Sequence, residues 1–338
     1  MMNGNLLTVM HTDANHAGSK AQNDIRNILN NEGFSNVYLD GEQSKWEKRL
    51  FFKTNLKNKI SNLDKENPFV VQYPFYMGRL ADHEIVKNIT ENFINSVVII
   101  HDLISLRTEQ NEQDIKKEID KINNFKYVVA HNQEMKKWLI ENGCRSEILD
   151  LELFDYLSSK CDVEKQGDRN RVFFAGNLGK SNFIYNEIID SKYHVYGINK
   201  KDVAVGFTYE GVVTPEQLAV NLSKENGFGL VWDGADIDFS DQYTKYNNPH
   251  KASLYLASGM PIVIWNQSAL ATFVIKNKVG IVVNSLSEVN QELEKLSVDD
   301  YNEMLTNVQI MRNKVLDGGF TKGVLNKLKK ATLKDVIH

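Results

Sequence analysis

The segment from Asn247 to Lys251 places several polar side chains at the start of a short predicted helix. Asn247 or Asn248 can cap that helix, and Pro249 suits its first helical position. The N–H groups and the positive dipole end of a helix N-terminus attract anions. Lys251 would work against the dipole in the first turn, so its presence indicates an anion opposite it. The alternative is a surface lysine beside an ordinary cap.

A turn rich in glycine follows the predicted strand RVFFA. Gly176 and Gly179 would let the backbone approach an anion closely, and Lys180 adds a positive charge. The turn is not a P-loop, because position 174 is Phe174 instead of glycine, and the chain has no G-x-G-x-x-G fingerprint. A tight turn between a strand and a helix, without a ligand, explains the same residues, so both interpretations stay open.

An aromatic side chain lies in a third such loop, TYEGVVTPEQL, before a helix predicted to begin near Pro215. Tyr209 either stacks there on a base or sugar or packs between loops. The strand end VWDG is a similar loop for which the sequence gives no sharper assignment.

Polar groups also follow the predicted strands of the first half of the chain. The stretch after the first strand contains Asp13, Asn15, His16, Gly18 and Lys20, and IIHD ends the fourth strand with His101 and Asp102. An imidazole or carboxylate at a strand end can act as a general base, which makes His16 and Asp102 the candidate catalytic residues. A helix cap or a buried hydrogen-bonded group is the alternative for each.

The elements that must position these residues form a repeating α/β pattern. Apolar, β-branched runs such as PFVVQY, SVVIIHD and PIVIW alternate with amphipathic helical runs. This pattern is typical of parallel sheets covered on both faces, where ligands bind at the carboxyl ends of the strands. We therefore predict two doubly wound, Rossmann-like domains facing a cleft, with helices at the C-terminus.

The predicted boundaries follow breaks in this rhythm, with a polar stretch at 151–170 that has few strand residues. They are a first domain at 1–155, a linker at 156–170, a second domain at 171–316 and a C-terminal helix at 317–338. The tail TKGVLNKLKKATLKDVIH either packs back on the N-terminal domain with a solvated lysine face or lies on a membrane surface.

The totals exclude several classes of protein. A chain of 338 residues suits two domains, and a net charge of −4 gives no general case for nucleic acid or anionic lipid as partner. No apolar run approaches the roughly 18–20 residues of a membrane span. Without a basic, cleavable N-terminal segment, we expect a cytoplasmic protein in which Cys144 and Cys161 are reduced structural thiols.

Six stretches together resemble bacterial GT-B glycosyltransferases, and the similarity covers nearly the whole chain: HTDANHAGSKAQND, IIHD, FAGNLGKS, YEGVVTPEQL, GLVWDG and NNPHKASLYLASGMPIV. Within that class the chain is similar to the glucosyltransferases that add the second sugar to serine-rich-repeat adhesins of streptococci and lactobacilli. These enzymes share a family with bacterial galactofuranosyltransferases. PHKASLYLASGMPIV and the glycine–lysine turn are the most specific parts of the resemblance.

The resemblance implies a metal-independent hexosyltransferase without a cofactor. Its donor would be UDP-glucose, its acceptor GlcNAc O-linked to serine or threonine of an adhesin, and its assembly a homo-oligomer. The residues that would bind UDP are Gly176, Gly179, Lys180, Tyr209, Asn247, Asn248 and Lys251. The acceptor loop would contain Asp13, Asn15, Gly18 and Lys20. His16 stands where the family pattern has a smaller residue.

The implied chemistry agrees with the residues. Departure of UDP from a sugar builds negative charge on the diphosphate, which a transferase without a metal must offset with cations and helix N–H groups. Lys180, Lys251 and the helix start at Pro249 supply such groups. The alternatives are a galactofuranosyl- or other hexosyltransferase of polysaccharide synthesis, a nucleotide-sugar epimerase and a non-catalytic GT-B-like subunit.

Overall fold

The computed structural model describes residues 2–10, 17–107, 111–160, 164–188, 190–233 and 243–337, without the side chains of 17, 18, 45 and 334–337. The chain divides into two compact units. Unit 1 contains the residues up to Glu152 together with the helical end from Phe320, and unit 2 runs from Leu153 to Gly319. No helix among the described residues is long and apolar enough to cross a membrane.

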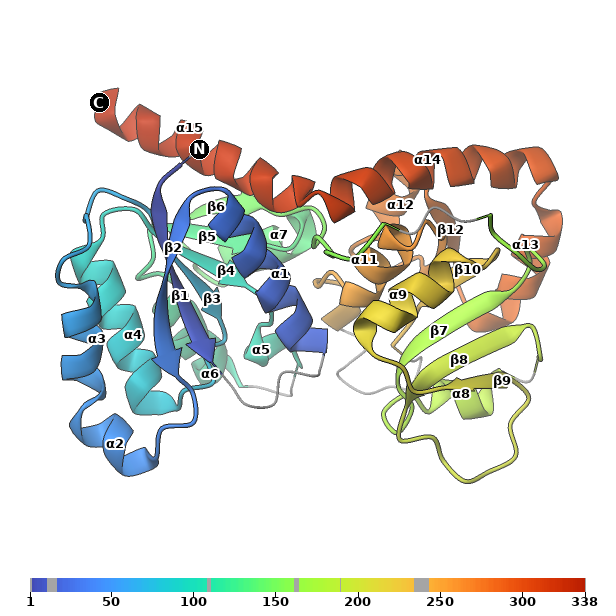
Figure 1. Cartoon of the computed structure of the whole chain (residues 1–338), viewed down its shortest axis with the longest axis horizontal. Coiled ribbons are helices and arrows are strands. Elements are labelled where there is room, and N and C mark those ends of the chain that lie inside the picture. Colours follow the sequence, from blue (N-terminus) through green and yellow to red (C-terminus); the bar gives the residue numbers. More distant parts are fainter. Residues whose placement is uncertain are drawn as a thin grey trace. The chain divides into compact units, whose positions relative to one another are not determined.

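Unit 1 is built on a parallel sheet of six strands in the order β2-β1-β3-β4-β5-β6 (Figure 1). The strands are β1 (Gly4–Met10), β2 (Phe34–Asp40), β3 (Phe69–Tyr73), β4 (Ser96–Ile100), β5 (Tyr127–Ala130) and β6 (Glu147–Asp150). The helices between them are α1 (Ala17–Asn31), α2 (Lys45–Leu50), α3 (Phe52–Ile60), α4 (Arg79–Asn92), α5 (Ile104–Arg107), α6 (Glu112–Ile122) and α7 (Gln133–Glu141).

Helices cover both faces of this sheet, which explains its unbroken apolar strands. On one face, α3, α4 and α6 contribute Leu56, Ile85 and Ile119 to the core. On the other face, α1 packs beside the C-terminal helix α15 (Gly319–Ile337), whose Val324 and Leu328 are buried. The apolar side of the lysine-rich tail is therefore occupied by unit 1 over these residues.

Unit 2 repeats the design with a second parallel sheet, in the order β12-β11-β10-β7-β8-β9 (Figure 1). The strands are β7 (Val172–Asn177), β8 (Tyr193–Ile198), β9 (Thr208–Gly211), β10 (Phe228–Val231), β11 (Ile262–Trp265) and β12 (Gly280–Val283). The helices are α8 (Phe183–Asn186), α9 (Pro215–Ser223), α11 (His250–Ala257), α12 (Ala271–Asn277), the 3-10 turn η1 (Leu286–Glu288), α13 (Val289–Lys295) and α14 (Val298–Leu316).

The prediction of two doubly wound domains is confirmed, with differences at a few elements. Strand β9 was not predicted, because its four residues are exposed or half-buried and leave no apolar pattern. Between β2 and β3 the chain forms two helices, α2 and α3, which are divided at Phe51. The helical C-terminal end is divided at Gly318, whose φ of 72° ends α14.

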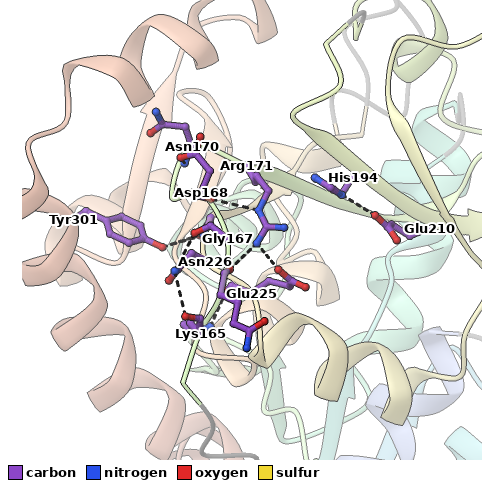
Figure 2. Close-up of polar contacts among 12 residues, drawn as sticks. Lys165, Gly167, Asp168, Asn170, Arg171, His194, Glu210, Glu225, Asn226 and Tyr301 are labelled. Carbon is purple, nitrogen blue, oxygen red and sulfur yellow. Dashed lines mark hydrogen bonds and ion pairs between the residues drawn. The ribbon is translucent and has the colours of Figure 1, made fainter.

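The polar segment that precedes β7 is attached to unit 2 at the amino end of its sheet (Figure 2). Gln166 N donates to Lys224 O at 2.7 Å, and Asn226 N donates to Gln166 O at 2.8 Å. The guanidinium of Arg171 forms an ion pair with Glu225. Backbone and side-chain hydrogen bonds therefore occupy the polar groups of this segment at the amino end of the sheet. The carboxyl ends of the strands remain the expected location of a ligand site.

Candidate functional site

The sheet of unit 2 has a topological switch point between β7 and β10. The chain proceeds from β7 to β8 and β9 on one side, and from β10 to β11 and β12 on the other. The two strands pair only at their amino ends, through Phe228 with Val172 and Gly229 with Phe173. In folds of this type, ligands bind beyond the carboxyl ends of the strands at such a point.

Lys251 lies at this switch point and connects the two strand ends. Its Nζ atom is 2.7 Å from Asp233 Oδ1 and donates to the carbonyl oxygen of Trp232 at 3.2 Å, just beyond β10. The same ammonium group lies 4.7 Å from the ring centroid of Phe174 in β7. The side chains of Lys251 and Asp233 keep 22% and 32% of their surface exposed. The pair is therefore fixed by its neighbours and still accessible to a ligand.

Gly176 leaves room for the Lys251 side chain. A Cβ atom at Gly176 would lie 3.1 Å from the ring of Phe174 and 3.5 Å from Lys251 Cε. A larger residue would crowd the ring of Phe174, over which the Lys251 ammonium lies, so glycine suits this position for packing as well as for access.

Helix α11, which carries Lys251, is fixed to the sheet by a buried tyrosine. The hydroxyl of Tyr255 accepts a hydrogen bond from Ala175 N at 2.9 Å, where β7 no longer pairs with β10. Burial raises the pKa of Tyr255 and keeps this hydroxyl neutral. Gly229 makes the contact possible, because a Cβ atom there would lie 2.0 Å from the Tyr255 ring.

The opposite end of α11 is held by two cations. Arg312 of α14, which is only 6% exposed, donates from Nε to Ala257 O at 3.1 Å, and Lys165 Nζ donates to Ser258 O at 3.3 Å. Cations at a helix C-terminus interact favourably with its dipole. Burial, with the charge of Arg312 nearby, lowers the pKa of Lys165 to about 8. These contacts fix the helix along its axis and leave its N-terminus at the switch point.

The turn after β7 is organised by Asn177, which the sequence analysis did not single out. Asn177 Oδ1 accepts from Gly179 N at 3.1 Å and from Asn199 Nδ2 at 3.1 Å, and Asn177 O accepts from Lys180 N at 3.1 Å. The N–H groups of Gly179 and Lys180 are thus used within the chain, unlike the backbone approach to an anion that we predicted. The turn instead presents the exposed side chain of Lys180, which makes no ion pair with any described residue.

Tyr209 reaches the same end of the sheet from the edge strand β9. Its hydroxyl donates to Gly197 O at 3.0 Å, and Gly197 pairs with Gly176 in the register of β7 and β8. The ring is 38% exposed, with Lys200 Nζ 5.8 Å from its centroid. Stacking of a base on this ring stays a prediction.

The start of α11 differs in detail from its prediction. Pro249 is the N-cap instead of the first helical residue, and its side chain makes no capping hydrogen bond, so proline takes the position that was predicted for Asn247 or Asn248. The reason is that Pro249 has an extended ψ of 127°, which delays the helix by one residue. Asn248 is buried, while Asn247 Oδ1 and Trp232 Nε1 are buried atoms without a hydrogen-bond partner among the described residues.

The predicted residues of unit 1 fall into two groups. Asp13, Asn15 and His16 lie outside the described residues. Gly18 and Lys20 lie in helix α1 instead of a loop, and Lys20 is paired with the buried carboxylate of Asp24 four residues later. The segment is thus helical at these two residues, and a role of Gly18 and Lys20 in acceptor binding stays a prediction.

Asp102 follows β4, and its Oδ2 atom lies 2.8 Å from Arg107 Nη1. His101 Nε2 lies 2.7 Å from Gln72 Oε1, which ties the imidazole to β3. Neither the catalytic role of Asp102 nor that of His16 is tested by these contacts, and both stay predictions.

Neither a reactive thiol nor a metal-binding cluster is found among the described residues. Cys144 is a buried thiol whose pKa is raised by burial, as expected of a structural cysteine, whereas Cys161 lies outside those ranges. The described residues contain no group of three or more His, Cys, Asp or Glu side chains that could hold a metal ion.

Comparison with known families gives two matches that follow the two units. The N-terminal domain of the glucosyltransferase 3-like family matches residues 5–153, and the C-terminal domain of the same family matches residues 172–328. The site at β7, β10 and α11 lies within the second match.

Individual relatives cover almost the full length of the chain. Beta-1,6-galactofuranosyltransferase WbbI of Escherichia coli (strain K12) is 29% identical, over 96% of this chain and 97% of the relative. Glucosyltransferase 3 of Streptococcus gordonii is 24% identical, over 90% and 92%. Sucrose-phosphate synthase from Thermosynechococcus elongatus shares the fold at 10% identity, with a TM-score of 0.65 over 99% of this chain and 100% of that chain.

Replacing Tyr255 by Phe tests whether the position of α11 matters for binding at its N-terminus. The change leaves the buried Ala175 N–H without an acceptor, so the free energy of unfolding should fall by about 1–3 kcal/mol in denaturant titrations. UDP affinity, measured by calorimetry, should fall as well, because α11 is released from β7.

Tyr301→Phe is the matched control for this variant. The hydroxyl of Tyr301 also accepts from a buried backbone group, Gly227 N at 2.9 Å, at the other end of the sheet. It should lower stability without a matching loss of UDP affinity. Equal affinities for the two variants would show that the anchor is irrelevant to binding.

Proposed function

The chain belongs to the glucosyltransferase 3-like family of GT-B glycosyltransferases, and from this premise we propose that it transfers glucose from UDP-glucose to GlcNAc O-linked to serine or threonine of a serine-rich-repeat adhesin. The observation that carries the proposal is the ammonium of Lys251, which is held at the switch point of unit 2 by Asp233 and by the carbonyl of Trp232. A fixed, accessible cation beside a helix N-terminus suits a diphosphate.

The transfer reaction creates negative charge that a cation at this position would stabilise. An acceptor hydroxyl oxygen forms a bond to the anomeric carbon, the bond from that carbon to the β-phosphate oxygen breaks, and the electron pair leaves with UDP. Negative charge therefore grows on the diphosphate during the reaction. The ammonium of Lys251 is already held at this edge of the sheet, so it would stabilise the transition state, in which the diphosphate gains charge, more than the substrate.

Two further groups are placed to assist the nucleotide. Trp232 Nε1 is a donor and Asn247 Oδ1 an acceptor, and neither has a hydrogen-bond partner among the described residues. Because buried polar atoms are normally satisfied in native proteins, a ligand with polar atoms of both kinds would complete them. The proton released by the acceptor hydroxyl would go to a base on unit 1, for which His16 and Asp102 remain the candidates.

Galactofuranosyl transfer is the second candidate. The chain is more similar to the galactofuranosyltransferase from E. coli, at 29% identity, than to glucosyltransferase 3 of S. gordonii, at 24%. The same diphosphate site would serve UDP-galactofuranose, and the two proposals differ only in sugar and acceptor.

Incubation with each UDP-sugar separates these candidates. With UDP-glucose and a serine-rich peptide that carries GlcNAc, mass spectrometry should show the gain of one hexose per modified site. Gain with UDP-galactofuranose alone would favour the second candidate, and conversion of the free UDP-sugar without acceptor would indicate an epimerase.

We propose that no metal is required, so activity should persist in excess EDTA; loss in EDTA with recovery on added Mg²⁺ or Mn²⁺ would contradict this.

Replacing Lys251 by Met tests the proposed binding group itself. Methionine keeps an unbranched side chain but removes the charge, and with it the cation–π contact with Phe174, so UDP should bind about tenfold to a hundredfold more weakly in calorimetry. Lys192→Met is the matched control, because Lys192 precedes β8 at the other end of the sheet and pairs only loosely with Glu294, at 3.9 Å.

The double variant Lys251→Met/Asp233→Asn separates binding from stability. It removes both charges of the pair and leaves no unpaired carboxylate. It should recover the stability of the wild type and still bind UDP weakly. Wild-type affinity in either variant would refute the proposed role of Lys251.

A further inference from the structure

Helix α2 of unit 1 carries an exposed apolar surface, formed by Trp46, Leu50 and the adjoining Phe51, which we call the α2 patch. These side chains are 72%, 63% and 64% exposed. Trp46 and Leu50 are four residues apart on one helix and thus share a face. Single exposed apolar residues are common, but three large ones within six positions indicate a contact surface.

The fold itself does not use the α2 patch. The next helix, α3, packs into the core through Phe52, Leu56 and Ile60, all at most 2% exposed. The N-terminus of α2 is stabilised by a capping box, in which Ser44 and Glu47 exchange hydrogen bonds between side chain and backbone. The core beneath this region is therefore filled by side chains of α3, while the apolar side chains of the patch remain exposed on α2.

The charges around the α2 patch differ in sign from the chain as a whole. The segment 45–59 contains six basic residues and one acid, although the whole chain has 40 Lys and Arg against 44 Asp and Glu. Arg49, Lys53, Lys57 and Lys59 are exposed. The single acid, Glu47, is engaged in the capping box, where its Oε2 accepts from Ser44 N at 2.8 Å. The apolar side chains therefore stand beside exposed cations that form no ion pair with a described residue, although the charge of the neighbouring Lys48 acts on Asp82 of α4.

We propose that the α2 patch docks on an anionic lipid surface. Tryptophan, leucine and phenylalanine enter the boundary between headgroups and acyl chains, while surrounding lysines and arginines attract lipid phosphates. A second copy of the chain or a protein partner would have to offer an acidic apolar surface instead. The overall charge of −4 conceals this local basic surface, so it gave no reason to expect a lipid partner.

The position of the α2 patch connects lipid binding with the transfer reaction, an inference that rests on the proposed function. Helix α2 follows β2, so it lies at the carboxyl edge of the unit 1 sheet, which is also the edge at which Asp102 follows β4. Docking there would place the edge of the sheet that carries the candidate base Asp102 beside the lipid surface. Lipid binding itself does not depend on the transfer reaction.

Sedimentation with vesicles tests the proposal on the full chain without any sugar donor. The protein should sediment with vesicles of phosphatidylglycerol and phosphatidylcholine, much less with phosphatidylcholine alone, and less at high salt. The variant Trp46→Ser/Leu50→Ser/Phe51→Ser should bind the anionic vesicles at least about tenfold more weakly. Arg49→Glu/Lys53→Glu should do the same without altering the apolar residues.

The matched control is Ile275→Ser/Ile310→Ser, which removes two similarly exposed apolar side chains from unit 2. It should sediment like the wild type, and all variants should bind UDP normally, which shows that they are folded. The proposal is overturned if the wild type does not bind anionic vesicles or if the triple variant binds them as well as the wild type. It is also overturned if the triple substitution only dissociates an oligomer in size-exclusion chromatography. Failure of hexose transfer would leave the vesicle result unaffected.

Discussion

The account depends on one positive charge that is fixed at the carboxyl ends of two diverging strands. The ammonium of Lys251 is held by the carboxylate of Asp233 and the carbonyl of Trp232 and lies over the ring of Phe174. Desolvating a cation is costly unless it is paired, and Asp233 supplies the pair in the free protein. A diphosphate can then meet a cation already in position, which is what stabilisation of a departing anion requires.

The rest of unit 2 serves to keep that charge in place. Tyr255 fixes α11 to β7 at the point where the ladder with β10 ends, and Arg312 and Lys165 hold the carbonyl groups at the other end of the helix. The contacts come from β7, from α14 and from the polar segment of unit 2 that precedes β7. A short helix of eight residues gains little stability alone, so its orientation must come from such packing.

The architecture could be predicted from the sequence because buried parallel strands leave unbroken β-branched runs. The position of Lys251 at the carboxyl edge of the sheet could be predicted because polar residues that follow such strands meet at one edge. Strand β9 was not predicted, because its exposed residues carry no pattern. The hydrogen bonds of Asn177 and the ion pair between Lys251 and Asp233 were also not predicted. Packing in the folded protein determines whether such a polar side chain contacts a neighbouring residue or a ligand, and the sequence alone does not show it. The Lys20–Asp24 pair follows from helical spacing, since residues four apart on a helix lie on the same face.

A crystal structure of the protein with bound UDP tests the central claim most directly. The account predicts that the diphosphate lies beyond the carboxyl ends of β7 and β10, with a phosphate oxygen within hydrogen-bond distance of Lys251 Nζ. A diphosphate bound elsewhere, or one that reaches the protein only through a divalent cation while Lys251 stays on Asp233, would contradict it.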